Sequence, residues 1–267
     1  MITTGSVIVM HNGAFVYVKG KQFMYTMNTR VRYSETDQTQ KLRLSCIINY
    51  FQDIATFHSM ALGRKAGKDP VEGNVWYLLS WDVTIHRYPE LGESVKIITD
   101  PYKMKGFYGY RRFFIRDDHD EVLSSGDSIW VLMDPEKKLP VKISDEITDL
   151  FVEPDADDTI RVKRKLPVKG DFGHPVSFEV TDFFTDSNHH VNNAYYVQWA
   201  GMVLPAGTYV ERIRVDYRQS AYRGDILVME HYLEDSVYRV RFTSKDDTLI
   251  ALIDMHIRNI EGCGSDD

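Results

Sequence analysis

Apolar and polar residues alternate with the period of a β-strand over much of the chain. Four long segments rich in Val, Ile, Tyr, Phe and Trp follow this pattern, and turn residues such as Pro89 and Gly92 separate them. The predicted strands cover residues 76–87, 94–102, 107–116 and 122–133. Near the N-terminus, Asn12-Gly13 between two short apolar runs predicts a small hairpin.

Two segments show helical spacing instead. In Ser45–Leu62, apolar side chains recur at intervals of three and four residues. Ser45 is the predicted N-cap of this helix, and Gly63 is the predicted residue just beyond its C-terminal end. The second predicted helix runs from about Asn193 to Leu204 and stops at Pro205.

The same order of features occurs twice along the chain. A Thr-Asp pair ending at Asp37 or Asp186 precedes each helix, and a glycine-acid turn at Gly92 or Gly224 follows each helix and its first strand. A repeat of this length indicates a duplicated domain, and one long helix wrapped by a curved antiparallel sheet is an α+β architecture. The predicted domains are 1–150 and 174–267, joined by a linker at 151–173. The whole stretch 141–173 contains EPDADD and RVKRK, and it predicts a charged linker with room for a strand or a short turn.

Charge and cysteine content narrow the class of protein. The 267-residue chain has a formal net charge of −7, which disfavours general nucleic-acid binding because that needs a basic face. Cys46 and Cys263 suit a reducing cytosol and match neither a disulfide framework nor a zinc site; we expect a core residue and a tail thiol. The first residues lack the features of a signal peptide, and no apolar run reaches the roughly 20 residues that span a bilayer. We therefore expect a soluble cytoplasmic protein.

The most unusual segment, 183–200, crowds polar side chains against the start of the second helix. Asp186, Asn188 and His190 are spaced by two, so they face the same way in an extended chain. A fully extended path would separate Asp186 from His190 by roughly 13 Å, so the loop must curl for both to reach one reacting group. Structural roles are the alternative: Asp186 could form a turn, His190 could be a structural histidine, and Asn192 or Asn193 could cap the helix.

Other kinds of site have less support. His189 and His190 are adjacent, and no spaced histidine or cysteine pattern accompanies them, so a metal site is disfavoured. The chain contains no G-x-S-x-G, no G-x-x-x-x-G-K-[ST] and no G-x-G-x-x-G, which disfavours α/β-hydrolases, nucleotide phosphate sites and dinucleotide-binding folds.

The loop sequence TDSNHHVNNAYYVQW resembles the D-x-N-x-H-V-N-N-x-x-Y-x-x-W signature of acyl-acyl-carrier-protein thioesterases. In the first half, VRYSETDQTQKLRLSCIINYFQDIATFHSMALG and RYPELGESVKI are similar to the same family, and the similarity covers roughly residues 25–260. The resemblance implies two tandem hot-dog domains, no cofactor, an acidic acyl carrier protein as partner, and an active site containing Asp186, Asn188 and His190.

One segment departs from the family pattern. Plant-type members carry Y-R-R-E-C after the motif, and this chain has DYRQSA, which places Ser220 and Ala221 at the Glu and Cys positions. A cysteine-nucleophile mechanism is therefore hard to sustain. Ser220 could hydrogen-bond a water or His190, or it could be an ordinary serine at a strand end.

These residues suit hydrolysis of a thioester by an aimed water. His190 can take a proton from water near neutral pH, Asp186 can orient the imidazole, and Asn188 can position the water or donate to the carbonyl. Backbone N–H groups at the helix start near Asn193 can stabilise the oxyanion. The reverse assignment, with Asp186 as the base and His190 as a donor, stays open.

The first half retains Asp37 but lacks the Asn and His, so we expect it to hold the acyl chain rather than catalyse. The resemblance implies a tunnel between its helix and sheet, and the candidate lining residues, which could equally be ordinary core, are Ile48, Phe51, Ile54, Trp76, Leu78 and Trp81. Two basic groups could dock the acidic carrier: Arg212, Arg214, Arg218 and Arg223, or Arg161, Lys163, Arg164 and Lys165.

Hydrolysis of acyl-carrier-protein thioesters is thus the leading interpretation. The alternatives are an acyl-coenzyme A thioesterase on the same fold or a catalytically silent acyl-binding protein; a dehydratase is disfavoured. Chain-length preference stays open, as does the oligomeric state, for which a homodimer is one option.

Overall fold

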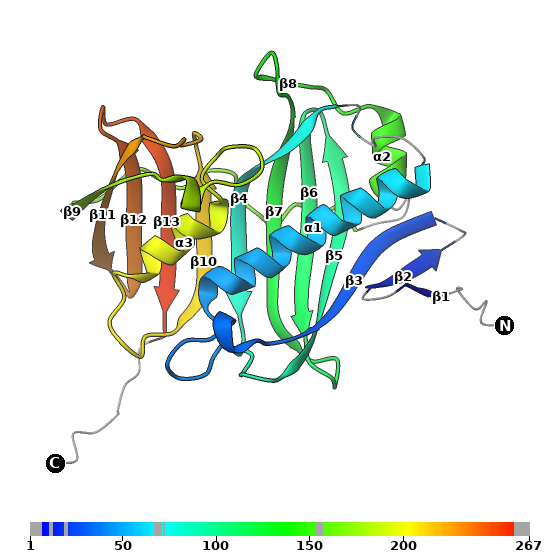
Figure 1. Cartoon of the computed structure of the whole chain (residues 1–267), viewed down its shortest axis with the longest axis horizontal. Coiled ribbons are helices and arrows are strands. Elements are labelled where there is room, and N and C mark those ends of the chain that lie inside the picture. The colour runs from blue at the N-terminus through cyan, green and yellow to red at the C-terminus, as the bar shows by residue number, and fades with distance from the viewer. Residues whose placement is uncertain are drawn as a thin grey trace. The chain divides into compact units, whose positions relative to one another are not determined.

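The computed structural model describes residues 7–10, 13–18, 21–66, 71, 73–152 and 157–258. The chain divides into two compact units, one of residues 1–81 with 86–162 and one of residues 82–85 with 163–267. Each unit contains a principal helix and long antiparallel strands (Figure 1). The α+β class predicted from the sequence is therefore confirmed. Within the described part of the chain, no helix is both long enough and apolar enough to cross a membrane.

The sheet of the first unit contains all the strands predicted from alternation. Its strands lie in the order β1-β2-β3-β5-β6-β7-β4, and β8 pairs with β7. Their bounds are β1 Val7–Met10, β2 Gly13–Val18, β3 Lys21–Arg30, β4 Val75–Ile85, β5 Ser94–Lys105, β6 Tyr108–Arg116, β7 Val122–Asp134 and β8 Leu139–Pro140. The predicted N-terminal hairpin is present as the antiparallel pair β1 and β2, in which Met10 faces Gly13; Asn12 lies outside the described residues.

Helix α1, Leu44–Ala66, runs along one face of this sheet (Figure 1). Both of its predicted ends were wrong. The backbone carbonyl of Arg43 accepts the N–H groups of Cys46 and Ile47, so the helix begins before Ser45, which lies in its first turn. Gly63 lies inside the helix. A mid-helix glycine costs about 1 kcal/mol relative to alanine, and burial of the adjacent Leu62 in a hydrophobic cluster offsets this cost.

A second helix of this unit, α2 (Asp145–Phe151), corrects the prediction of a charged linker from residue 141 onward. The Ser144 hydroxyl caps it by accepting the backbone N–H of Ile147 at 3.2 Å. Ile147 and Phe151 are buried in a cluster with Leu62 and Leu132. This part of the stretch is helical because its apolar residues complete the core at one end of α1.

The second unit has the same plan with a shorter helix (Figure 1). Its strands lie in the order β10-β13-β12-β11-β9, with bounds β9 Gly173–Glu179, β10 Val210–Tyr217, β11 Ile226–Glu234, β12 Val237–Ser244 and β13 Leu249–Ile257. Helix α3, Asn193–Gly201, buries Tyr196 and Val197. It ends before the predicted Leu204. The backbone N–H groups of residues 202–204 each donate to the carbonyl three residues earlier, which is the pattern of a turn and not of an α-helix.

The repeat extends to individual backbone hydrogen bonds. A short 3-10 turn, η1 (Tyr33–Glu35) or η2 (Asp182–Phe184), precedes the loop before each long helix. Gly92 and Gly224 both adopt left-handed backbone conformations, with φ of 82° and 86°. The N–H of each glycine donates to a valine carbonyl near the start of its own repeat. The two predicted glycine-acid turns are therefore equivalent in structure as well as in sequence.

Candidate active site

The polar loop before α3 is a tight turn. The backbone N–H of Asp186 donates to the His190 carbonyl at 2.8 Å. Asp186 Oδ1 accepts the N–H of Asn188 at 2.8 Å and lies 3.4 Å from the N–H of His190. His189 adopts a left-handed conformation with φ of 61°. The loop thus curls, as a shared reaction centre for Asp186 and His190 requires.

The first unit contains the same turn. The N–H of Asp37 donates to the Lys41 carbonyl at 2.9 Å, and Asp37 Oδ1 accepts the N–H of Thr39 at 2.8 Å and its hydroxyl at 2.7 Å. Thr39 and Lys41 occupy the positions that Asn188 and His190 occupy in the second unit. The aspartate of each repeat therefore holds a turn, and at the two matched positions only the second turn carries an amide and an imidazole.

The segment that bears Ser220 runs beside this loop. The N–H of Val191 donates to the Ala221 carbonyl at 2.9 Å, and His190 pairs with Tyr222 through the backbone. The His190 ring packs edge-on against the Tyr222 ring, with centroids 4.8 Å apart. Ser220 makes no hydrogen bond with a described residue, so its catalytic role stays a prediction.

Asp186 uses only one carboxylate oxygen to hold the turn. Oδ2 makes no hydrogen bond with any described residue, and the carboxylate is not bonded to the His190 imidazole. The expected orientation of His190 by Asp186 is therefore indirect in this structure and acts through the backbone of the turn. Oδ2 is left to interact with a water or a substrate group.

The N-terminus of α3 begins directly after the loop. Asn192 is the N-cap, because its Oδ1 accepts the N–H of Ala194 at 3.0 Å. The backbone N–H and side-chain amide of Asn193 have no partner among the described residues. Its carbonyl accepts the Tyr217 hydroxyl at 2.8 Å, and burial raises the pKa of Tyr217 well above 10, so this donor stays protonated. The donors of Asn193 are therefore free at the start of the helix.

Cys46 is poorly suited to act as a nucleophile. Burial, reinforced by the Glu35 carboxylate, raises the pKa of the Cys46 thiol, and a thiol must become a thiolate to attack. Cys263 lies outside the described residues. Within the part of the chain that the structure describes, no group of three or more His, Cys, Asp or Glu side chains could hold a metal ion.

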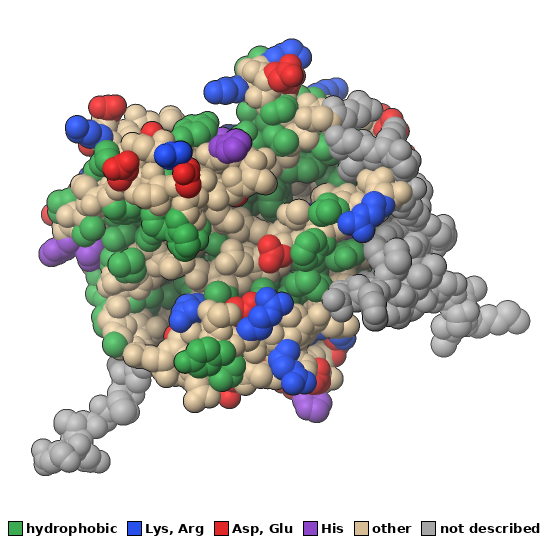
Figure 2. Space-filling model, in the orientation of Figure 1, with side chains coloured by type: hydrophobic (Ala, Val, Ile, Leu, Met, Phe, Trp, Pro, Cys, Tyr) green, Lys and Arg blue, Asp and Glu red, His purple; other side chains and the backbone are tan. Residues whose placement is uncertain are grey.

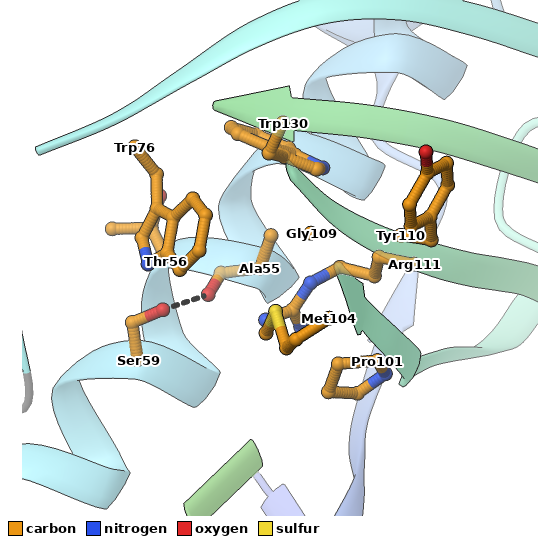
Figure 3. Close-up of a pocket in the computed structure, with 10 residues that line it drawn as sticks. All are labelled: Ala55, Thr56, Ser59, Trp76, Pro101, Met104, Gly109, Tyr110, Arg111 and Trp130. Atoms are coloured by element: carbon orange, nitrogen blue, oxygen red, sulfur yellow. Dashed lines mark hydrogen bonds between the residues drawn. The ribbon is translucent and has the colours of Figure 1, made fainter. Parts of the chain in front are cut away.

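A cavity of about 180 Å³ lies in the first unit, between α1 and its sheet (Figure 3). The lining is mainly apolar and consists of Ala55, Thr56, Ser59, Trp76, Pro101, Met104, Gly109, Tyr110, Arg111 and Trp130. Gly109 leaves room for two neighbouring side chains of the lining, because a Cβ there would lie 3.0 Å from Met104 Sδ and 3.2 Å from the Trp76 ring. The Ser59 hydroxyl donates to the Ala55 carbonyl at 3.1 Å (Figure 3).

One of the six predicted lining residues, Trp76, lies on this cavity. The other five are buried but do not line it; they are Ile48, Phe51, Ile54, Leu78 and Trp81. Phe51 and Trp81 each pack against Phe113 with ring centroids 5.0 Å apart. These five residues occupy core positions, and a role for them in acyl binding stays a prediction.

Two polar residues of this region were not among the site residues predicted from the sequence. Arg111, on β6, lines the cavity, and its Nη1 lies 3.1 Å from His58 Nδ1 and 3.1 Å from Thr99 Oγ1. His58, on α1, is fully buried. A signal for Arg111 is present in the sequence, because it shares strand parity with the buried Phe113. A charge at an inward-facing strand position is unusual.

All four arginines proposed to dock the carrier form ion pairs within the second unit. Their partners are Asp82 for Arg212 and Arg214, Asp216 for Arg218, and Asp182 for Arg223. Arg223 is 73% exposed, and its partner Asp182 begins the 3-10 turn before the loop. In the alternative group, Arg161 pairs with Asp157, while Lys163 and Lys165 are exposed. On the face drawn in Figure 2, basic and acidic side chains are interspersed.

Residues 22–151 match the family model described as the acyl-ACP thioesterase N-terminal domain. Residues 22–151 thus belong to the acyl-ACP thioesterase family. An acyl-[acyl-carrier-protein] hydrolase of Cuphea viscosissima is 27% identical over 192 residues, which cover 66% of this chain and 46% of the relative. A palmitoyl-acyl carrier protein thioesterase of Arabidopsis thaliana is 25% identical over 225 residues, covering 76% of this chain and 54% of the relative. The chain spans about half the length of these curated relatives.

Solved structures of family members share the fold. An acyl-ACP thioesterase from Bacteroides thetaiotaomicron aligns with a TM-score of 0.77 at 16% identity, over 88% of this chain and 98% of that one. A 12:0-ACP thioesterase from Umbellularia californica aligns with a TM-score of 0.74 at 19% identity, over 88% of this chain and 97% of that one. The hot-dog fold predicted from the resemblance is thereby confirmed.

Proposed function

We propose that this protein hydrolyses acyl-acyl-carrier-protein thioesters, releasing a free fatty acid and the carrier protein. One observation carries the proposal beyond family membership. Both units build the same aspartate-held turn before a helix, but only the second turn has an amide and an imidazole, at Asn188 and His190. Because the backbone is the same, the two turns differ in the functional groups that their side chains carry. The second turn is the site suited to activating water.

The loop supplies the groups that thioester hydrolysis needs. His190 takes the proton of a water as it attacks the thioester carbonyl, and the free oxygen of Asp186 or the amide of Asn188 orients that water. The open N–H of Asn193 donates to the oxyanion at the positive end of α3. Collapse of the tetrahedral intermediate expels the carrier's thiolate, and the imidazolium of His190 returns a proton to it.

The other two parts of the substrate have separate sites in this proposal. The cavity in the first unit receives the acyl chain, since its walls are largely tryptophan, methionine, proline and alanine side chains. The acidic carrier docks near Arg223, which is exposed next to the turn that precedes the loop. A bound carrier carboxylate would replace Asp182 as the ion-pair partner of Arg223.

The test compares matched positions of the two turns. His190→Ala and Asp186→Asn should lower kcat for an acyl-acyl-carrier protein by about 10²–10⁴-fold, the range of general-base assistance. Lys41→Ala and Asp37→Asn change the corresponding residues of the first turn and should leave kcat unchanged. Unchanged turnover in both second-turn variants would refute the catalytic assignment. Faster hydrolysis of acyl-coenzyme A than of the matched acyl-carrier protein would reassign the substrate.

A further inference from the structure

Arg111 is a buried cation that forms no ion pair with any residue the structure describes. Its residue surface is 7% exposed, and both of its hydrogen bonds use Nη1, to His58 and Thr99. Nε and Nη2 make no hydrogen bond with a described residue, and the guanidinium forms no ion pair with one. The Asp100 carboxylate exerts a favourable field on Arg111, but its ion pair, at 2.8 Å, is with Arg112.

The charge of Arg111 persists at neutral pH. Burial lowers its pKa to about 10, which still leaves the guanidinium protonated at pH 7. Burial, and then the charge of Arg111, lower the pKa of His58 well below 6.5, so the imidazole is neutral and its Nδ1 accepts the bond from Arg111. The Phe151 ring, 6.0 Å from the guanidinium carbon, adds only a weak attraction. A positive charge that forms no ion pair with a described residue therefore lies at the cavity.

The cavity around this charge is small and mainly apolar. Figure 3 shows the guanidinium beside Met104, among the residues that line the cavity. An apolar cavity of about 150 Å³ can hold a benzene molecule, so this one, of about 180 Å³, accepts slightly more than six carbon atoms. A purely hydrocarbon occupant would displace water from Nε and Nη2 without replacing its hydrogen bonds, which is unfavourable for a charged group.

We infer that the cavity binds the end of an aliphatic chain that carries an oxygen acceptor, held by Nε and Nη2 of Arg111. This inference rests on the proposed function and deepens it, because it makes the preferred acyl group one with a hydroxyl, oxo or carboxyl oxygen near its far end. The same chemistry could come from a second source, the carboxylate of a free fatty acid. Planar guanidinium donors suit either kind of oxygen.

Binding of short probes tests the site without requiring turnover. Trp76 and Trp130 line the cavity, so their fluorescence reports on titration with hexanoate, hexan-1-ol and hexane. The oxygenated probes should bind at least tenfold more tightly than hexane, and Arg111→Met should abolish the preference. Arg116→Met, on the same strand but paired with the exposed Asp120, is the matched control and should retain it.

Equal binding of the three probes by the wild-type protein would overturn the inference, and this comparison needs no variant to fold. Retention of the preference in a folded Arg111→Met protein would also overturn it. The Lys variant, Arg111→Lys, keeps the charge and should keep part of the preference.

Kinetic measurements distinguish the two sources of the bound oxygen. They also test the proposed function separately from the binding site. Pairs of acyl-carrier proteins with and without a terminal hydroxyl, over a series of chain lengths, should differ in kcat/KM by about tenfold in favour of the hydroxylated chain. Equal kcat/KM together with preferential binding of hexanoate would assign the site to a free fatty-acid carboxylate. No hydrolysis of any member, with the probe preference intact, would refute the proposed function and leave the oxygen-binding site standing.

Discussion

The charge of Asp186 can be removed without removing the turn that it holds. In Asp186→Asn, the side-chain oxygen can still accept the N–H of Asn188, now 2.8 Å from Oδ1, while an amide NH₂ replaces the free Oδ2. The variant therefore separates the structural role of Asp186 from its chemical role. We expect a folded protein with an intact turn and a slow reaction.

The expected magnitudes differ between stability and rate. Asp186→Ala removes one good hydrogen bond, because the contact to the N–H of His190 is long, at 3.4 Å. A bond to a charged group contributes about 1.5–3 kcal/mol, but the Asn188 N–H is in an exposed turn and can bind water instead. We expect a loss of about 1 kcal/mol, or about 2–4 °C in Tm. Asp186→Asn should change Tm by less than about 1 °C and lower kcat by about 10²–10⁴-fold.

The assay combines thermal unfolding with single-substrate kinetics on one acyl-carrier protein. Asp37→Asn and Asp37→Ala provide the reference, because Asp37 holds the equivalent turn and has no predicted chemistry. Asp37→Ala should lower Tm more than Asp186→Ala does, since it loses bonds to both the N–H and the hydroxyl of Thr39. Full activity of Asp186→Asn with loss of activity in Asp186→Ala would show that the turn alone is needed.

Three further predictions concern docking, stability and pH. Arg223→Glu should raise KM for acyl-carrier protein about tenfold and leave KM for acyl-coenzyme A unchanged, because the exposed Arg223 contacts only the carrier in our proposal; equal effects on both substrates would contradict it. Asp216→Ala should lower the free energy of unfolding by about 3 kcal/mol in a denaturant titration, since it leaves Arg218 without its buried partner. His58 has a lowered pKa when folded, so the unfolded state binds more protons below pH 6.5. Its contribution to stability should fall as pH drops below that value, and a pH series of Tm with and without His58→Gln checks this.

Local residue chemistry made the fold largely predictable. The turn at Asp37 recurs at Asp186 because each aspartate is followed two residues later by an N–H that it can accept. Gly92 and Gly224 occupy left-handed positions that most other residues avoid. These requirements are short-range, so the sequence alone revealed the repeat and the succession of helix, strands and turns within it.

Features that depend on tertiary packing were harder to predict. Helix α2 has only seven residues, too few for periodicity to stand out, and it is stable because Ile147 and Phe151 pack against other elements. The end of α1 was misplaced for the same reason, since burial of Leu62 extends the helix through Gly63.

The polar loop before α3 and the cavity of the first unit differ in the same way. The loop is contiguous, so its motif predicted which side chains gather at one turn. The cavity collects residues from α1 and four strands, and its apolar walls look like core in the sequence. Phe51 and Ile54 face core neighbours, whereas Ala55 and Ser59, farther along the same helix, line the space. Only the packed structure distinguishes these two groups.

The closeness of Gly109 to Trp76 and Met104 has a consequence for altering chain-length selectivity. A residue without a side chain can only gain atoms, so a substitution at Gly109 adds atoms against Met104 and Trp76, which both line the cavity. Lengthening the space requires trimming an opposing side chain such as Trp76 or Met104, and both are half-buried, so the protein would lose packing contacts. In the proposed function, a shorter acyl chain would therefore need one substitution at Gly109, whereas a longer one would need the loss of packed atoms.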